Sequence, residues 1–223
     1  MEHKRLTLFA GHYGSGKTNI AVNYAMCLRR EGKRVCIADL DIVNPYFRTK
    51  DSERELSELG IELISPKFAN TNVDLPALPA ESYRLVQDKS VYGVMDIGGD
   101  DRGAYALGRY RDAIKAEGDY RMAFVVNCYR PLTSNVSDTL EIMKEIEAAS
   151  GIAFNCIVNN SNLGDETTKD VVLDSLEFAK NLSSVSGLPI WLHTVEERIA
   201  GEILGIPVLP LVLQKKYFDI PKM

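Results

Sequence analysis

The chain has 223 residues, of which 45% are hydrophobic and 26% charged, a balance ordinary for a folded globular domain. Its formal net charge of -5, with no basic run interleaved with aromatic residues, argues against a nucleic-acid-binding surface. The longest apolar runs have the length of strands, so we expect neither a signal peptide nor a membrane-spanning segment. The 4 cysteines are widely spaced, which favours reduced core residues in a cytoplasmic protein.

Apolar runs of strand length alternate with amphipathic helical patterns along the chain. This alternation predicts an α/β fold in a single domain, residues 1–223, with a mostly parallel sheet covered by helices on both faces. The expected strands are residues 6–10, 34–39, 61–65, 92–96, 122–127, 154–159, 189–193 and 208–211. The expected helices are residues 17–30, 52–59, 104–116, 134–149, 168–183 and 196–204. Ligands of such sheets gather where the strands end, so the residues that follow each strand are the candidate site.

The first strand leads into Gly-His-Tyr-Gly-Ser-Gly-Lys-Thr, residues 11–18, which matches the phosphate-loop pattern G-x-x-x-x-G-K-[ST] and precedes a helix. In such a loop the backbone N–H groups and the helix N-terminus attract phosphate. We expect Lys17 to act in catalysis between the β- and γ-phosphates, and the Thr18 hydroxyl to coordinate Mg²⁺. The predicted nucleotide-binding residues here are Gly11, His12, Tyr13, Gly14, Ser15, Gly16, Lys17, Thr18 and Asn19.

The second strand is followed by two carboxylates, Asp39 and Asp41, with one residue between them. Carboxylates at the end of a buried strand are costly unless a cation lies close by. We therefore predict that Asp39 and Asp41 help to hold Mg²⁺, and that Asp41 is catalytic because it orients the attacking water. The alternative is a strand end closed by an Asx turn.

The fourth strand ends in the pattern D-x-x-G, from Asp96 to Gly99. An aspartate in this position reaches Mg²⁺, often through a water, and the following glycine N–H senses a γ-phosphate. We predict that Asp96 is a metal ligand and that Gly99 binds nucleotide in a switch segment. A glycine-rich turn explains the same four letters when they are taken alone.

The sixth strand is followed by Asn159, Asn160, Ser161 and Asn162, where the base of a nucleotide is usually recognised. Guanine recognition by the pattern N-K-x-D needs a carboxylate at the last position, and here that position holds Asn162. An amide offers the donor and acceptor pair that suits adenine. We predict that Asn159 contacts adenine and that the cofactor is ATP with Mg²⁺, the alternative being that these amides only form a turn.

Taken in order, the phosphate loop, the Asp39–Asp41 segment with Pro45 after it, the Asp96 segment and the Asn159 segment resemble the MinD/ParA-type P-loop ATPases of the SIMIBI class. The resemblance covers nearly the whole chain. It implies a three-layer P-loop NTPase with a mostly parallel sheet of about seven or eight strands. It also implies slow ATP hydrolysis that acts as a switch on a protein partner, often through a nucleotide-dependent homodimer.

The phosphate loop departs from that family at one position. The family pattern is K-G-G-x-G-K-[ST], and its first lysine reaches the phosphates bound by a second copy. Here His12 stands in that place and Tyr13 follows it. The mechanism that uses this lysine is therefore in doubt, and His12 is either a pH-dependent contact or a surface turn residue.

Three other functions stay open. A metallochaperone GTPase would carry N-K-x-D and a Cys/His motif, and neither is present in the sequence. An ATP-dependent synthetase or transferase of the dethiobiotin-synthetase type would need anion-binding arginines, for which the candidates are Arg48, Arg102, Arg109, Arg111 and Arg130. A binding module that does not hydrolyse nucleotide would use residues 66–79 as a partner-facing surface.

Overall fold

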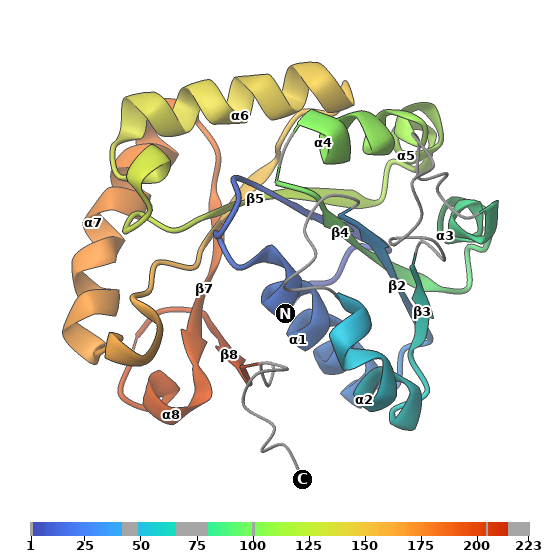
Figure 1. The fold of residues 1–223 in the computed structure, drawn as a ribbon, viewed down its shortest axis with the longest axis horizontal. Helices are drawn as coiled ribbons and strands as arrows, with labels where there is room; N and C mark the ends of the chain where they lie inside the picture. The colour runs from blue at the N-terminus through green and yellow to red at the C-terminus, as the bar shows by residue number, and fades with distance from the viewer. Residues whose placement is uncertain (1, 42–48, 66–79, 100, 204, 214–223) are drawn as a thin grey trace, which may run out of the picture.

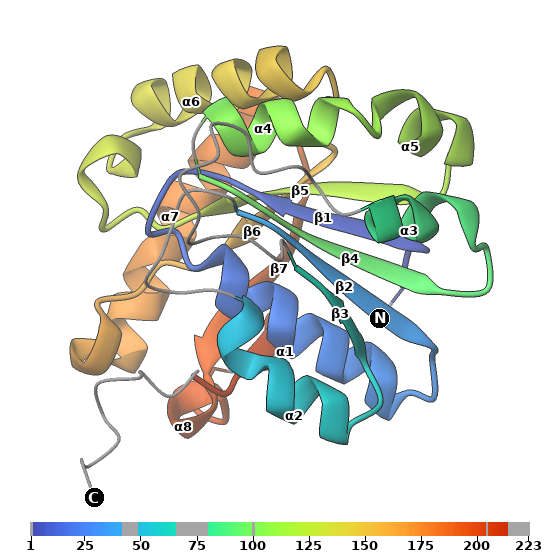
Figure 2. The same ribbon diagram turned by 45° about the vertical axis from the view of Figure 1, so that its right-hand side comes forward.

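The computed structural model describes residues 2–41, 49–65, 80–99, 101–203 and 205–213. They form one 8-stranded sheet in the order β3-β2-β4-β1-β5-β6-β7-β8, and every neighbouring pair is parallel. Helices α1 and α2 cover one face of the sheet and α4, α5 and α6 the other (Figures 1 and 2). The predicted α/β fold, with a P-loop NTPase sheet between two helical layers, is confirmed. No described helix is long and apolar enough to cross a membrane.

The elements follow one another as strand and helix along most of the chain. The strands are β1 (Leu6–Ala10), β2 (Val35–Leu40), β3 (Glu62–Ile64), β4 (Tyr92–Ile97), β5 (Tyr120–Val126), β6 (Cys156–Asn159), β7 (Ile190–Glu196) and β8 (Val208–Leu211). The helices are α1 (Lys17–Arg30), α2 (Glu53–Glu58), α3 (Arg84–Gln87), α4 (Asp101–Gly108), α5 (Arg111–Glu117), α6 (Val136–Ser150), α7 (Lys169–Ser186) and α8 (Glu197–Ala200). Short 3-10 helices span Thr49–Ser52, Ala80–Tyr83, Pro131–Thr133 and Gly164–Glu166.

The central strand β1 is buried along its whole length and divides the core in two. Because side chains alternate along a strand, Leu6 and Leu8 face the layer of α4, α5 and α6, and Phe9 faces α1. The ring of Phe9 packs edge-on against Tyr24 of α1, with 5.6 Å between the ring centroids. Burial on both faces explains why the strands read as continuous apolar runs.

The long helices α6 and α7 begin and end at residues that favour helix termini. The side chain of Asn135 accepts a hydrogen bond from the Asp138 N–H and caps α6, and the Thr168 side chain caps α7 in the same way. α6 ends at Gly151 in the left-handed region, with φ at 68°. These local signals agree with the helices expected from the sequence pattern.

Two predicted helices differ from those observed. The helix predicted for residues 104–116 is two helices, because the chain turns at Tyr110, whose fully buried ring packs against Tyr83 with 4.8 Å between the centroids. The helix predicted for residues 196–204 is only the short α8, because β7 extends to Glu196, where it pairs with Leu211 of β8. In both places tertiary contacts outweigh a helical pattern.

Candidate functional site

The loop between β1 and α1 is shaped by glycines in conformations that other residues rarely adopt. Gly14 has φ 76° and Gly16, directly before α1, has φ 88°. A Cβ on Gly16 would lie 2.2 Å from Asn160 Nδ2, and one on Gly11 would lie 2.3 Å from the carbonyl oxygen of Val125. The loop therefore rests against β5 and the segment after β6 at positions where only glycine fits.

Lys17 lies under this loop with a nearly buried side chain. Its Nζ donates a hydrogen bond to the His12 carbonyl oxygen at 3.2 Å. The segment after β4 approaches the same ammonium, since a Cβ on Gly99 would lie 3.0 Å from Lys17 Nζ and 2.7 Å from the Tyr13 nitrogen. The structure thus places the predicted switch glycine against the predicted phosphate-binding lysine.

Aspartates near the ends of β2 and β4 lie side by side on neighbouring strands. Asp39 and Asp96 are register partners on these neighbouring strands, and their residues are 2% and 1% exposed. Asp39 Oδ1 accepts a hydrogen bond from the Asp41 N–H at 3.0 Å, which is the contact of an Asx-type turn. The sequence left a metal site and an Asx turn as alternatives for this segment. The structure contains the Asx-turn contact, and Asp41 also lines the cavity described below.

Asp96 carries the strongest electrostatic signal of the site. Its Oδ2 accepts a hydrogen bond from the Thr49 hydroxyl at 3.0 Å, whereas Oδ1 is buried and has no hydrogen-bond partner among the described residues. Burial raises the pKa of Asp96 to about 6, and Lys17 and the Thr18 hydroxyl oppose that shift. A buried oxygen without a partner is costly, so this carboxylate is suited to a cation at that oxygen.

The same residues fit a Mg²⁺ ion bound together with a nucleotide. Thr18, Asp39, Asp41 and Asp96 would supply or orient its oxygen ligands, since Mg²⁺ takes one or two protein ligands and completes its shell with phosphate and water. Within the described part of the chain, no group of three or more His, Cys, Asp and Glu side chains is arranged to enclose a metal ion. A nucleotide-linked Mg²⁺ site does not require such a group.

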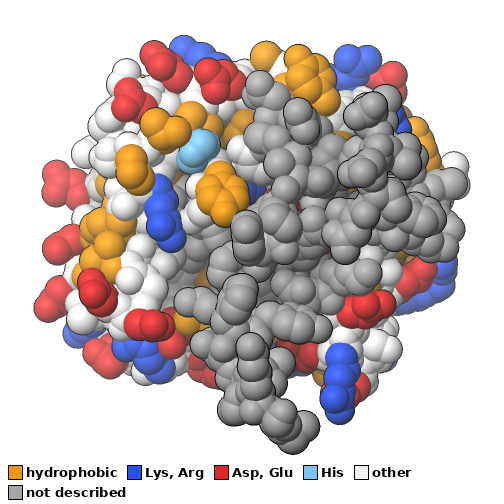
Figure 3. Space-filling view, in the orientation of Figure 1, with side chains coloured by type: hydrophobic (Ala, Val, Ile, Leu, Met, Phe, Trp, Pro, Cys, Tyr) orange, Lys and Arg blue, Asp and Glu red, His pale blue; other side chains and the backbone are white. Residues whose placement is uncertain are grey.

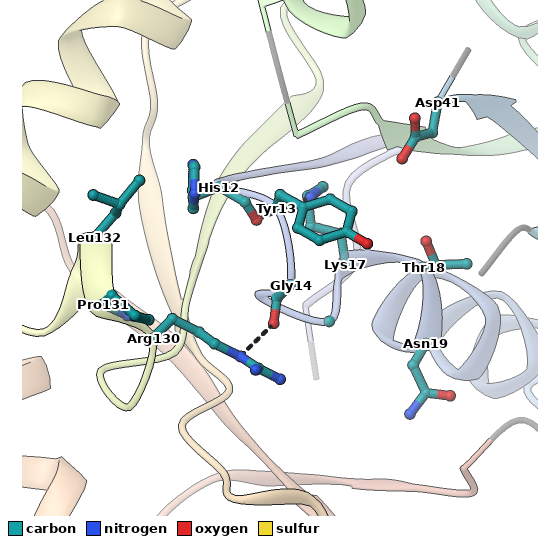
Figure 4. Close-up of a pocket in the computed structure, with 11 residues that line it drawn as sticks. His12, Tyr13, Gly14, Lys17, Thr18, Asn19, Asp41, Arg130, Pro131 and Leu132 are labelled. Carbon is teal, nitrogen blue, oxygen red and sulfur yellow. Dashed lines mark hydrogen bonds between the residues drawn. The ribbon is translucent and has the colours of Figure 1, made fainter. Parts of the chain in front are cut away.

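A cavity of about 620 Å³ opens beside the loop, within the size range of small-molecule sites (Figure 4). A smaller cavity of about 150 Å³ adjoins it and shares Gly14, Gly16, Asn19 and Arg130 with it. Lys17 and Asp41, where we expect the phosphates, line only the larger cavity, and Asn160 lines only the smaller one. The larger cavity is lined by His12, Tyr13, Gly14, Gly16, Lys17, Thr18, Asn19, Asp41, Arg130, Pro131 and Leu132.

Asn159 does not line either cavity. The residue is 2% exposed, its Nδ2 donates to Ser175 Oγ at 2.9 Å, and its Oδ1 accepts from the hydroxyl and N–H of Ser161. Asn159 is the last residue of β6, and its side chain points toward α7. The structure therefore places this amide away from both cavities, where the predicted adenine contact would not form. Its successors Asn160, Ser161 and Asn162 line the smaller cavity instead.

The amides that do line the smaller cavity also hold the loops. Asn162 donates to the Asn160 carbonyl at 2.7 Å and accepts from the Gly164 N–H at 3.1 Å, as a turn residue would. Asn160 Nδ2 donates to the Ser15 carbonyl at 2.7 Å, and its Oδ1 accepts from the Thr194 hydroxyl. Asn160 therefore ties the phosphate loop to β6 and β7.

Three residues that the sequence analysis did not assign belong to this site: Thr49, Asn160 and Glu196. The Thr49 hydroxyl donates a hydrogen bond to Asp96 at the carboxyl end of β4, and Glu196 lines the smaller cavity from the end of β7. Thr49 and Glu196 lie in no recognised motif, and Asn160 lies in the Asn159 segment without a role assigned to it there, so only the meeting of separate strand ends reveals their contacts. The end of β7 is one of those strand ends, and the rule that ligands gather there is the one available signal for Glu196.

His12 is poorly suited to the role of a cation. Burial and the nearby Lys17 charge lower its pKa below the usual value of 6.5, against the opposing effect of Glu145. The imidazole is therefore neutral at neutral pH. Tyr13, the next residue, is 57% exposed at the mouth of the larger cavity.

No protein-family model matches the chain, and no curated protein matches it. Solved structures do. FtsY of Thermotoga maritima is 18% identical with a TM-score of 0.59, over 86% of this chain and 62% of that one. FtsY of Elizabethkingia anophelis is 16% identical with a TM-score of 0.55, over 96% and 64%. The signal recognition particle 54 kDa protein of Aeropyrum pernix K1, in complex with GDP, is 18% identical with a TM-score of 0.52, over 85% and 41%.

These similarities show the fold alone, an α/β P-loop NTPase fold that the chain shares with these structures. The chain spans about three fifths of the length of the FtsY structures that it matches. The neighbours are proteins of the signal recognition particle and its receptor, so the expected resemblance is confirmed for the fold and not for the MinD/ParA family in particular.

Proposed function

We propose that this protein is a Mg²⁺-dependent nucleoside triphosphatase. The observation that carries the proposal is a meeting of groups around one glycine loop: the Lys17 ammonium beneath it, Gly99 close to that ammonium, and the buried Asp96, one oxygen of which has no hydrogen-bond partner among the described residues. The loop geometry accounts for phosphate binding, and the carboxylate accounts for the metal.

Catalysis by these residues would consist of positioning and charge neutralisation. The loop N–H groups and Lys17 would bind the phosphates, and Mg²⁺ held by Thr18, Asp39, Asp41 and Asp96 would neutralise charge on them. Asp41 would accept a hydrogen bond from the attacking water. The water oxygen bonds to the γ-phosphorus, the bond from that phosphorus to its bridging oxygen breaks, and the nucleoside diphosphate leaves with phosphate as the second product.

ATP is the nucleotide that we propose, because no carboxylate follows β6 at the guanine-reading position, where Asn162 stands. GTP is the competing candidate, and one observation favours it. Glu196 places a carboxylate in the wall of the smaller cavity. A carboxylate can accept hydrogen bonds from the two adjacent N–H donors that guanine presents.

We propose further that the nucleotide controls binding of a protein partner, with a nucleotide-dependent homodimer as one form of this switch. Two large apolar side chains support an interaction surface at the cavity mouth: Tyr13 is 57% and Leu132 53% exposed. Tyr13 and Leu132 line the larger cavity together with His12 (Figure 4), and Figure 3 shows hydrophobic side chains around the histidine on this face. Residues 66–79, the other predicted partner surface, lie outside the described residues.

The synthetase alternative rests on arginines beside the phosphate site. Arg130 lines the larger cavity, whereas Arg111 pairs with Asp112, and Arg109 is exposed and lines neither cavity. Arg48 and the side chain of Arg102 lie outside what the structure describes. A second small-molecule substrate therefore has the support of one of the described arginine side chains, and the triphosphatase is the better-supported function.

Titration calorimetry with slowly hydrolysed Mg-ATP and Mg-GTP analogues tests the proposal. We expect tight binding of the ATP analogue, and a loss of about 100-fold or more in affinity for Lys17→Ala, because a charge-assisted phosphate contact is removed. The control is Lys144→Ala, which removes an exposed lysine of α6. Undiminished affinity in Lys17→Ala would refute the site. Preference for GTP would keep the triphosphatase and replace the nucleotide.

A further inference from the structure

Arg130 lies in a loop whose backbone is held rigidly. It follows β5 and directly precedes Pro131, and its extended backbone, with φ -95° and ψ 139°, is the conformation that a following proline favours. The Arg130 N–H donates to the Asn127 carbonyl at 3.1 Å, and the Thr133 hydroxyl donates to the same carbonyl at 2.7 Å. The side chain of Arg130 therefore projects from a fixed base.

That side chain crosses to the phosphate loop. Arg130 Nε donates a hydrogen bond to the Gly14 carbonyl at 3.2 Å, as the dashed line in Figure 4 marks. A Cβ on Gly14 would lie 3.6 Å from the same Nε, and the φ of 76° at this residue disfavours any side chain there. One edge of the guanidinium is thus oriented by the loop, and its terminal nitrogens have no hydrogen-bond acceptor among the described residues.

The charge of Arg130 is not neutralised by the described part of the protein. Arg5, Arg84 and Arg198 each pair with a carboxylate, whereas no described carboxylate lies within salt-bridge distance of Arg130. Of the lysines that the structure describes, Lys17 is the one that lines the larger cavity. A triphosphate carries more negative charge than one lysine and one Mg²⁺ neutralise, so a second protein cation at this site has a clear role.

The position of Arg130 indicates which phosphate it would meet. It lines both cavities, at the junction between the end that holds Lys17 and Asp41 and the end that holds Asn160. A nucleotide that lies along the two cavities places the phosphate next to its ribose at that junction. This phosphate is present in the diphosphate and in the triphosphate alike.

We propose that Arg130 is a nucleotide-binding residue that contacts the phosphate adjoining the ribose, with its guanidinium oriented by the Gly14 carbonyl. The inference rests on the proposed function. Under this inference Arg130 is the second protein cation of the site, beside Lys17, because the neutral His12 does not carry that charge. A planar guanidinium held at its Nε presents the N–H donors of its two terminal nitrogens to an anion, a geometry that lysine lacks.

Calorimetry of four variants with Mg-ADP and a slowly hydrolysed Mg-ATP analogue tests this inference, or with the guanine pair if the unchanged protein prefers it. We expect Arg130→Ala to weaken binding of the di- and triphosphate equally, by about tenfold or more. Arg130→Gln, which keeps an N–H donor for the Gly14 carbonyl, should lose a similar amount, and Arg130→Lys should lose less. The matched control is Arg54→Ala, which removes a side chain that is 93% exposed and lines neither cavity.

Melting temperatures without nucleotide separate binding from a structural role. We expect those of the Arg130 variants to equal that of the unchanged protein. Unaltered affinity in Arg130→Ala, a loss confined to the triphosphate, or a parallel loss of nucleotide-free stability would each overturn the inference. If the unchanged protein binds no nucleotide, the proposed function fails instead, so the two failures are distinguishable.

Discussion

The two ends of the sheet both bury charged groups, yet they satisfy them differently. At the start of β1, Arg5 is 7% exposed, pairs with Glu117, and donates to the carbonyl oxygens of Leu85 at 2.8 Å and Val91 at 3.1 Å. Where β4 ends, Asp96 is 1% exposed and leaves one oxygen without a partner among the described residues. At the first end the protein supplies a counter-charge and carbonyl acceptors, and among the described residues only Arg5 Nη2 is left without a hydrogen-bond partner on that guanidinium. At the second end we propose that a bound ion completes the set of partners of Asp96.

The difference shows that the partners of a buried charge indicate whether the charge serves the fold or a ligand. A charge whose partners come from the same chain contributes to the fold, and removing one partner exposes the cost of the other. A charge without enough partners lowers the stability of the empty protein and raises its affinity for a complementary ion. The comparison therefore predicts opposite stability effects for substitutions at the two ends.

The largest stability effect is expected at the end of the sheet where Arg5 pairs with Glu117. Arg5→Ala leaves Glu117 buried with Lys89 as its remaining cation and removes the donors of several carbonyl oxygens. The free energy of unfolding should fall by about 3 to 5 kcal/mol, as measured by urea denaturation. Nucleotide affinity of the folded fraction should be unchanged, since Arg5 lies at the opposite end of β1 from the phosphate loop. A stability loss below about 1 kcal/mol would show that the ion pair is replaceable.

A smaller effect of opposite sign is expected at the site. Asp96→Asn removes a carboxylate whose pKa burial raises, and keeps an oxygen that accepts from the Thr49 hydroxyl. In the absence of Mg²⁺ and nucleotide, the free energy of unfolding should rise by about 1 to 2 kcal/mol at neutral pH, because loss of the attraction to Lys17 offsets part of the gain.

The same Asp96→Asn protein should lose Mg²⁺-dependent triphosphate hydrolysis. Asp112→Asn, in which an exposed carboxylate is replaced, serves as the control for both measurements. Destabilisation of the metal-free protein by Asp96→Asn would contradict the view that this end of the sheet is incomplete without a ligand.

The smallest effect concerns the pH dependence of stability. Burial and the nearby Lys180 lower the pKa of His193, and Asn159 Nδ2 lies 3.1 Å from His193 Nδ1, which must accept because the Asn159 oxygen already accepts from Ser161. Neutral His193 therefore contributes stability that is present above pH 6.5, its ordinary pKa, and is lost as pH falls through the lowered value.

His193→Gln keeps an acceptor for Asn159 without a titrating group. We expect the difference in unfolding free energy between the two proteins to shift in favour of the variant as pH falls below neutrality, measured by urea denaturation across that range. Because the difference is taken at each pH, other titrating groups cancel. A difference that does not vary with pH would mean that His193 is not held neutral by its surroundings.

Much of the fold could be predicted from local patterns, because each pattern agrees with what the tertiary structure needs. The helix predicted for residues 17–30 and the strands predicted for residues 6–10 and 208–211 have the observed bounds. The failures occur where long-range contacts decide. Burial of Tyr110 breaks one helical pattern into α4 and α5, and pairing of β7 with β8 shortens another to α8.

The sequence by itself determined the phosphate loop, the order of strands and helices, and the carboxylates at two strand ends, because a short motif and local periodicity carry those features. Only the tertiary structure decided which side chains meet: Asp39 beside Asp96, Thr49 on Asp96, Gly99 on Lys17, Asn160 on the loop, and Arg130 at the junction of the two cavities. It also turned Asn159 into the protein interior, because the side chain of the last residue of β6 faces α7. Contacts between residues far apart in the chain depend on strand order and register, which no local pattern encodes.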